Sequence, residues 1–246
     1  VINNTFTAQV ASSETTGNYT TSLWSGTDAG KINVNNGSVT FSQTEYYPND
    51  GGTVYMKGFA PQATINAGQV AYTISGKEDI MVTSEISGSR TDNTGKELTF
   101  NHLLTQLKFK LVAEDADAIT YWGSITSITV KDVEKDLVLN LNTGELTAAT
   151  TPNKGDLEVS EDFASKALTT TAVENGYIMV LPSTTAYVLN IKTTENTGGV
   201  DVTITPVVTV KGTAHEITLT FKRSEIASSA KTTPWTTGDL GSGEVK

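Results

Sequence analysis

The sequence predicts an all-β protein built from β-sandwiches, on three observations. Threonine occupies 42 of the 246 positions, and β-branched residues such as threonine and valine favour strands over helices. Apolar and polar residues alternate in many short stretches, which is typical of strands with one buried face. Turn residues separate these stretches at the short intervals found in sandwiches. A helical or coiled-coil protein is therefore excluded.

Strands are predicted where the alternation lies between turn signals, at residues 54–56, 70–74, 125–130, 137–141, 177–181 and 187–191. Asn, Gly, Asp and Pro cluster between them and predict turns at residues 35–37, 48–52 and 196–199. One short stretch, Glu161–Ala167, has some helical character.

A hairpin is predicted near the end of the chain. Val200–Val210 alternates over its whole length, Lys211–Thr213 resembles a turn, and His215–Phe221 alternates again. Pro206 has no backbone N–H to donate, so we expect an edge strand or a bulge there.

One segment changes its apolar phase. In its first half, the residues expected on the buried face have even numbers: Leu98, Phe100, His102 and Leu104. In its second half they have odd numbers: Leu107, Phe109 and Leu111. A change near Thr105 requires a bulge, a bend or a transfer between sheets. We place a domain junction just before this segment, with Ser87–Lys96 as the linker, which gives an N-terminal sandwich domain (1–96) and a C-terminal one (97–246).

Composition excludes several classes of function. The net charge of −10 argues against a nucleic-acid partner, because such binding depends on clustered Lys and Arg. No apolar run reaches the roughly 20 residues of a membrane span, and Val1–Val10 lacks the features of a signal peptide, so a mature or trimmed soluble chain is expected. Without cysteine, this chain has no disulfide, thiolate zinc site or site for lipid attachment.

The residues for catalysis are few. His102 and His215 are the only histidines, each on a predicted strand and without a second imidazole at a metal-ligand spacing. Asp115 and Asp117 offer carboxylates for calcium, but the loop lacks the Gly and closing Glu of an EF-hand. No nucleophile elbow, P-loop or zinc-protease motif occurs. We therefore expect no enzyme activity, no cofactor and no metal.

Three tryptophans, Trp24, Trp122 and Trp235, lie far apart in the sequence. On an exposed face they would stack on sugar rings, whereas inside the protein they would cap the sandwich cores. The sequence favours the second interpretation.

Several segments resemble the fimbrillin family of Bacteroidales, the subunits of type V pili. Glu97–Leu111 is similar to the family's F-x-H-x-L-x-x-L-x-F-x-L segment, with Phe100, His102, Leu104, Leu107, Phe109 and Leu111 at the motif positions. The other similar segments follow the family's order, namely Tyr46–Pro48, Phe59–Pro61, Glu78–Val82 and Trp235–Gly238.

The resemblance implies two tandem transthyretin-like Greek-key β-sandwich domains. It also implies export as a lipoprotein precursor, so that contact with the outer membrane would depend on a lipid anchor absent from this chain. The expected location is extracellular, at the bacterial cell surface. The expected role is a structural, accessory or tip subunit of a fimbrium that contributes to adhesion and binds other pilus subunits by β-strand addition.

Strand exchange directs attention to the first predicted strand, whose apolar positions are Ile2, Phe6, Ala8 and Val10. Two interpretations are open. This strand is either displaced during polymerisation, which leaves a groove for a neighbour's strand, or it is an ordinary edge strand.

Two features depart from the family pattern. No Lys or Arg precedes Lys31, so the activating protease site lies upstream of Val1, has been removed, or does not exist. In the tail, Thr236–Lys246, only Leu240 and Val245 are apolar, which makes it a poor donor strand. Either the tail becomes ordered on binding, or the chain accepts a strand without offering one.

A competing interpretation keeps the same sandwiches and makes the protein a monomeric surface module that binds glycans or host proteins. Sugar binding that depends on Trp24 or Trp122 would favour it.

Overall fold

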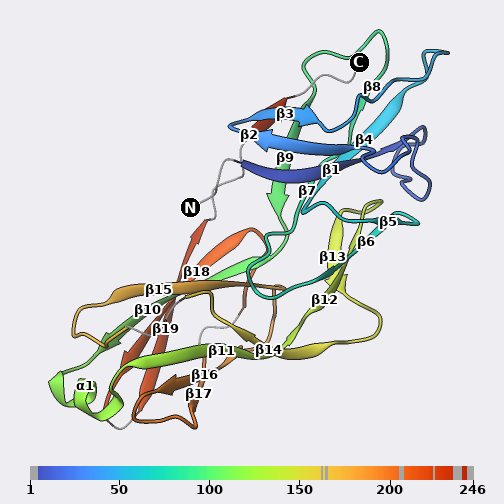
Figure 1. Cartoon of the computed structure of the whole chain (residues 1–246). Helices are drawn as coiled ribbons and strands as arrows, with labels where there is room; N and C mark the ends of the chain where they lie inside the picture. The colour runs from blue at the N-terminus through green and yellow to red at the C-terminus, as the bar shows by residue number, and fades with distance from the viewer. Residues whose placement is uncertain are drawn as a thin grey trace.

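The computed structural model describes residues 5–161, 163, 166–204, 208–223, 225–234 and 240–242. In this part the chain forms twenty strands and one short helix, which confirms the all-β prediction. Figure 1 shows an N-terminal lobe at the top, a C-terminal lobe at the bottom and a small sheet beside their junction. Among the described residues, no helix has the length and apolarity needed to cross a membrane.

The N-terminal lobe is a ring of strands. Its members are β1 (Thr5–Ser13), β2 (Lys31–Asn35), β3 (Ser38–Phe41), β4 (Val54–Ala60), β7 (Met81–Thr83), β8 (Ile86–Gly88), β9 (Glu97–His102) and β20 (Leu240–Ser242). They pair in the order β1-β2-β3-β20-β9-β7-β4-β8, and β4 also pairs with β1. This last pairing closes the sheet around a core that includes Val34, Met56 and Phe100.

The C-terminal lobe consists of two four-stranded sheets. One contains β15 (Val173–Val180), β10 (Thr105–Ala113), β18 (Thr213–Phe221) and β19 (Ile226–Pro234); the other contains β14 (Lys154–Glu158), β11 (Ile125–Glu134), β16 (Val188–Thr193) and β17 (Val200–Thr203). Buried residues from both sheets belong to one core, for example Phe109 and Leu219 from the first and Ile128 and Ile191 from the second.

A third sheet, the junction sheet, joins the two halves of the sequence. It contains β13 (Glu145–Ala148), β12 (Asp136–Asn140), β6 (Gln69–Thr73) and β5 (Ile65–Asn66). Leu139 of β12 pairs with Val70 of β6, and both side chains are fully buried. Neither half of the chain therefore completes this sheet alone.

The predicted strands outside the hairpin all form, but the hairpin itself is wrong. Strand β17 pairs with β16, whereas β18 pairs with β10 and β19 in the opposite sheet. A turn does occur at Lys211–Gly212, where the Gly212 amide donates to the Leu104 carbonyl oxygen at 2.9 Å. The alternation indicated which face of each strand is buried. It could not indicate which strands pair, because both sheets bury their faces in the same core. Pro206 lies outside the described residues.

The helix α1 (Ala116–Trp122) lies where no helix was expected from the sequence. The Asp115 carboxylate caps it by accepting from the Ala118 amide at 2.8 Å, so this acid has a structural role. In the stretch Glu161–Ala167, residues 162, 164 and 165 lie outside the described part.

The phase change near Thr105 marks a transfer between lobes. Strand β9 ends at His102 and pairs with β7, whereas β10 begins at Thr105 in the C-terminal lobe. Strand pairing thus departs from the predicted division at residue 96 in two ways, because β9 lies in the N-terminal lobe and β6 pairs with β12. We propose that the boundary between sandwiches lies at residues 103–104. The transthyretin-like Greek-key description remains a prediction.

A buried lysine joins the N-terminal lobe to the junction sheet. Lys57 Nζ donates to the Leu141 carbonyl oxygen at 2.8 Å and lies 5.5 Å from the centroid of the Tyr19 ring. Burial lowers the pKa of Lys57, while the negative charge of Glu85 acts in the opposite direction. The Tyr19 hydroxyl donates to Glu85 at 2.7 Å, and burial raises its pKa. Lys57 thus links β4 of the N-terminal lobe to the end of β12.

Candidate functional site at the first strand

Strand β1 lies between two neighbours. Its first part, Thr5–Gln9, pairs with β2, and its second part, Gln9–Ser13, pairs with β4. Both pairings are antiparallel. Strand β1 thus joins β2 to β4, and the two pairings cover different halves of the strand and overlap only at Gln9. The choice between a displaced strand and an ordinary edge strand stays a prediction.

The apolar positions predicted for the first strand face the core of the N-terminal lobe. Ala8 and Val10 are buried, and the half-buried Phe6 packs against the same core. Its ring meets that of Phe100 edge to face, with centroids 5.2 Å apart. Ile2 lies outside the described residues. Three of the four predicted residues thus hold β1 against the core of the N-terminal lobe.

A glycine allows the chain to approach β1 closely. The Val10 amide donates to the Gly30 carbonyl oxygen at 2.8 Å. Gly30 has a φ of +66°, a conformation that glycine adopts at little cost. A Cβ at this position would overlap the backbone carbonyl oxygen of Val10. Only glycine fits here without a shift of β1 or of the loop.

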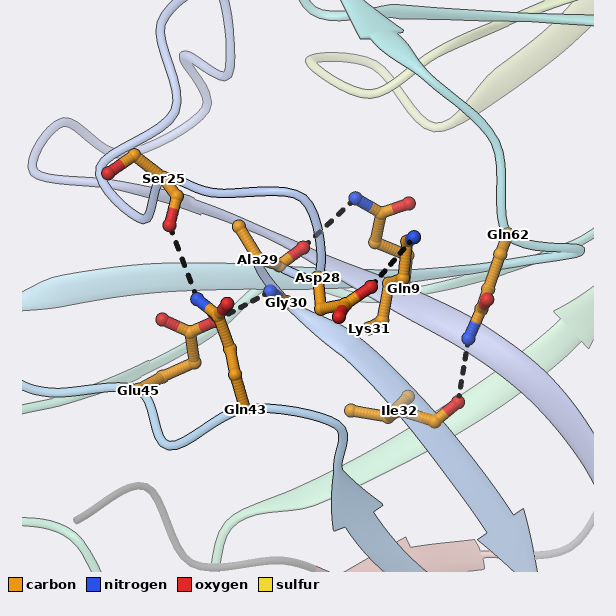
Figure 2. Close-up of polar contacts among 10 residues, drawn as sticks. All are labelled: Gln9, Ser25, Asp28, Ala29, Gly30, Lys31, Ile32, Gln43, Glu45 and Gln62. Carbon is orange, nitrogen blue, oxygen red and sulfur yellow. Dashed lines mark hydrogen bonds and ion pairs between the residues drawn. The ribbon is translucent and has the colours of Figure 1, made fainter.

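A buried carboxylate holds the Gly30 loop, as Figure 2 shows. Glu45 is only 6% exposed, and its Oε1 accepts from the Gly30 amide at 2.7 Å and from Gln43 Nε2 at 3.0 Å. The same Gln43 nitrogen donates to the Ser25 carbonyl oxygen at 3.2 Å. Charge-assisted hydrogen bonds of this kind are among the stronger ones in proteins. No sequence pattern predicts this cluster, because its residues lie in loops and most of them are polar.

Two further contacts in Figure 2 fix the start of β2 beside β1. Gln9 Nε2 donates to the Ala29 carbonyl oxygen at 3.1 Å. Lys31 Nζ lies 3.1 Å from Asp28 Oδ1 in an exposed ion pair. Lys31 is the first basic residue of the chain, and the structure places it where the loop after β1 meets β2.

Replacing Glu45 with alanine is expected to reduce the free energy of unfolding by about 1–3 kcal/mol, because the Gly30 amide would lose its buried acceptor. The matched control is Asp28→Ala, which breaks the exposed ion pair and should cost less than about 1 kcal/mol. Urea unfolding measures both losses, and amide hydrogen exchange at Gly30 locates the first. Equal losses in the two variants would contradict the role given to Glu45.

The C-terminal segment also reaches this lobe. Strand β20 pairs antiparallel with β9, from Leu240 opposite Thr99 to Ser242 opposite Glu97, and Ser242 pairs parallel with Ser38 of β3. The sequence did not predict this strand. The adjoining residues 235–239 and 243–246 lie outside the described part.

The six motif residues are all buried, and they divide between two cores. Phe100 belongs to the core beneath β1. Leu104, Leu107, Phe109 and Leu111 belong to the larger core of the C-terminal lobe and junction sheet. His102 lies at the transfer between lobes, with its Nδ1 2.9 Å from Asp79 Oδ1. Burial in two cores supports a structural role for the motif.

The other residues considered for chemistry have packing roles. Trp24 and Trp122 are 6% and 5% exposed, which confirms that they cap cores. Burial lowers the pKa of His215, which favours its neutral form. Among the described residues, no group of three or more His, Cys, Asp and Glu side chains could hold a metal ion. Trp235 lies outside this part of the chain.

The described residues form an all-β protein in which β20 completes the sheet of the N-terminal lobe. The chain belongs to the fimbrillin-like family, whose family model matches residues 2–235. Members of this family are structural, non-enzymatic proteins of fimbriae, which places the chain at the cell surface or outside the cell. A search of curated protein sequences finds no match.

Solved structures share the fold at low sequence identity. A candidate cell adhesion protein from Bacteroides uniformis is 18% identical with a TM-score of 0.70, over 94% of this chain and 91% of that one. A candidate cell adhesion protein from Bacteroides ovatus is 15% identical with a TM-score of 0.63, over 95% and 88%. At these identities the likeness shows the fold alone.

Proposed function

We propose that the protein is a fimbrial subunit that accepts a neighbour's strand in the position now filled by β1. The observation that carries this proposal is the double pairing of β1, which closes the ring between β2 and β4. Membership of the fimbrillin-like family supports assembly with other fimbrial subunits.

Removal of β1 would open a groove with a polar rim and an apolar floor. The facing edges of β2 and β4 would lose their backbone partners, and Phe100 would lose its contact with Phe6. An extended strand from another subunit can satisfy both needs by β-augmentation. Because β1 is nine residues long, the groove spans roughly 30 Å. A joint of that length can dissociate very slowly, which suits a fibre.

The position of the C-terminal strand favours an accessory or tip subunit. Strand β20 pairs with β9 and β3 of its own chain. A tail engaged in this way offers no free strand to a following subunit. We therefore infer that the chain receives a strand without donating one. A lipid anchor on the precursor would connect the subunit to the outer membrane before assembly.

The test separates β1 from the rest of the folded protein. A protease recognition sequence is inserted between Thr20 and Thr21, two exposed loop residues, and the purified protein is cleaved. A fluorescent peptide of residues 1–13 is then added, and its incorporation is followed by fluorescence anisotropy. We expect cleaved protein to exchange β1 for the peptide and to stay monomeric in size-exclusion chromatography, because the chain accepts a strand without donating one.

The matched control carries the same inserted sequence between Asn196 and Thr197, in a turn of the C-terminal lobe. Cleavage there leaves β1 covalently attached, so no exchange for the peptide is expected. A monomer that incorporates no peptide after cleavage beside β1, even on warming, would count against strand exchange and in favour of a monomeric surface module.

A further inference from the structure

A cavity of about 680 Å³ opens at the outer end of the N-terminal lobe. Its lining residues include Glu14, Tyr46, Pro48, Asn49, Arg90 and Asn93. The volume falls in the range of about 300–1,000 Å³ typical of sites for small ligands. The chain that follows β1, the loop between β3 and β4, and the loop between β8 and β9 all contribute to it, and all of these residues are described.

The cavity has an exposed aromatic ring on a fixed backbone. Tyr46 is 68% exposed, so its ring is open to contact with a ligand, and the amphipathic ring of tyrosine suits such a contact. Beneath it, the buried Trp24 donates its indole N–H to the Tyr46 carbonyl oxygen at 3.2 Å. Trp24 also packs edge to face against Phe41, with centroids 5.8 Å apart. Trp24 is therefore a positioning residue that fixes the backbone at Tyr46.

Planar polar groups line the same cavity. Arg90 Nη1 donates to Asn49 Oδ1 at 3.1 Å, which orients both side chains. A guanidinium carries five N–H donors, and an amide both donates and accepts. Glu14 adds acceptors, and its negative charge balances Arg90. This combination suits neighbouring hydroxyl groups, each of which donates and accepts a hydrogen bond.

The loop that carries Tyr46 is held in shape before any ligand arrives. Tyr47 is only 5% exposed, and a Cβ at Gly88 would overlap its hydroxyl group, so glycine at that position permits the burial. The Gly51 amide donates to the Pro48 carbonyl oxygen at 3.2 Å. A pre-ordered loop lowers the entropic cost of binding.

We propose that this cavity binds a neutral pyranose unit of a glycan. The Tyr46 ring would stack on the apolar face of the sugar, and Arg90, Asn49 and Glu14 would hydrogen-bond its hydroxyl groups. A single arginine balanced by a glutamate is a poor match for a phosphate or another strongly anionic group. The site adjoins the end of β1, where Glu14 follows Ser13 and the Trp24 amide donates to Ser12 Oγ at 3.0 Å. It uses none of the backbone pairs between β1 and its neighbouring strands, and its test uses the full chain with β1 in place.

Binding is tested on the full chain with a printed glycan array and by saturation-transfer NMR. The NMR probes are methyl β-D-galactopyranoside, methyl α-D-mannopyranoside and methyl α-D-N-acetylneuraminide. We expect saturation transfer to at least one neutral glycoside and array binding to glycans that contain it. Tyr46→Ala and Arg90→Gln should each weaken array binding at least tenfold, whereas Tyr46→Phe, which keeps the ring, should retain it.

The matched control is Tyr121→Ala, which removes a similarly exposed tyrosine (53%) from α1 in the other lobe and should leave binding unchanged. Circular dichroism verifies that each variant is folded. Absence of binding in both assays would overturn the proposal, as would undiminished binding by folded Tyr46→Ala. Binding restricted to the acidic neuraminide would overturn the assignment to a neutral sugar.

Discussion

Replacing Phe100 with alanine is expected to reduce the free energy of unfolding by about 3–5 kcal/mol, the usual cost of removing a buried aromatic side chain. Phe100 is fully buried, and its ring packs against Phe6 of β1. The Phe100 ring lies next to the backbone of Gly58, close to the Thr83 side chain. Gly58 has no side chain that could move into the cavity left by the ring. Urea unfolding measures the loss, and hydrogen exchange should show that the β1 amides become less protected.

A double-mutant cycle tests whether β1 shares this loss. Phe6→Leu alone should cost less than Phe100→Ala, because Phe6 is only half-buried. The coupling between the two rings should be about 0.5–1.5 kcal/mol, the usual range for edge-to-face aromatic pairs. Fully additive losses would show that Phe100 stabilises the lobe without holding β1.

Replacing Gly30 with alanine is expected to reduce the free energy of unfolding by about 2–3 kcal/mol. A left-handed conformation costs a residue with a Cβ roughly 1–2 kcal/mol, and the added methyl group would overlap the Val10 carbonyl oxygen. The loop or β1 must then move, which lengthens the hydrogen bond from Val10 to Gly30. Thermal and urea unfolding give the loss, and faster exchange of the Val10 amide would locate it.

Gly95→Ala is the control for backbone conformation alone. Gly95 has nearly the same φ, +65°, but a Cβ there would meet no atom within 4 Å. Its substitution should cost only the conformational part, about 1 kcal/mol. Similar losses at the two positions would mean that the close approach of Gly30 to β1 has little energetic weight.

Much of the local structure could be predicted from the sequence. Alternation correctly indicated the buried faces of strands such as Leu137–Leu141 and Tyr187–Ile191. The phase change near Thr105 left a bulge, a bend or a transfer between sheets open, and the structure has the transfer. Strand partners could not be predicted in the same way. Alternation shows that a strand has a buried face, but it does not show which neighbour supplies the hydrogen bonds. The failed hairpin at Val200–Phe221 has this cause.

The candidate site shows the same limit. The apolar residues Phe6, Ala8 and Val10 predict a buried face within one short stretch, and in the structure Ala8 and Val10 are buried and Phe6 is half-buried. Glu45 and Gly30 are separated by a complete hairpin, β2–β3. Their hydrogen bond exists only once that hairpin has folded, so no local pattern reveals it. Tyr46 belongs to an aromatic-proline segment that can be recognised in the sequence. Its contact with the buried Trp24, whose indole N–H donates to the Tyr46 carbonyl oxygen, joins residues 22 positions apart and has no local sequence pattern.

The ring of the N-terminal lobe has a consequence for the order of events during biosynthesis. In the described structure, β20 provides the connection between β3 and β9, and it comes from the last few residues of the chain. A ribosome releases these residues only after everything before them has been made. The lobe whose first strands are translated earliest can therefore be sealed only after β20 has also been made.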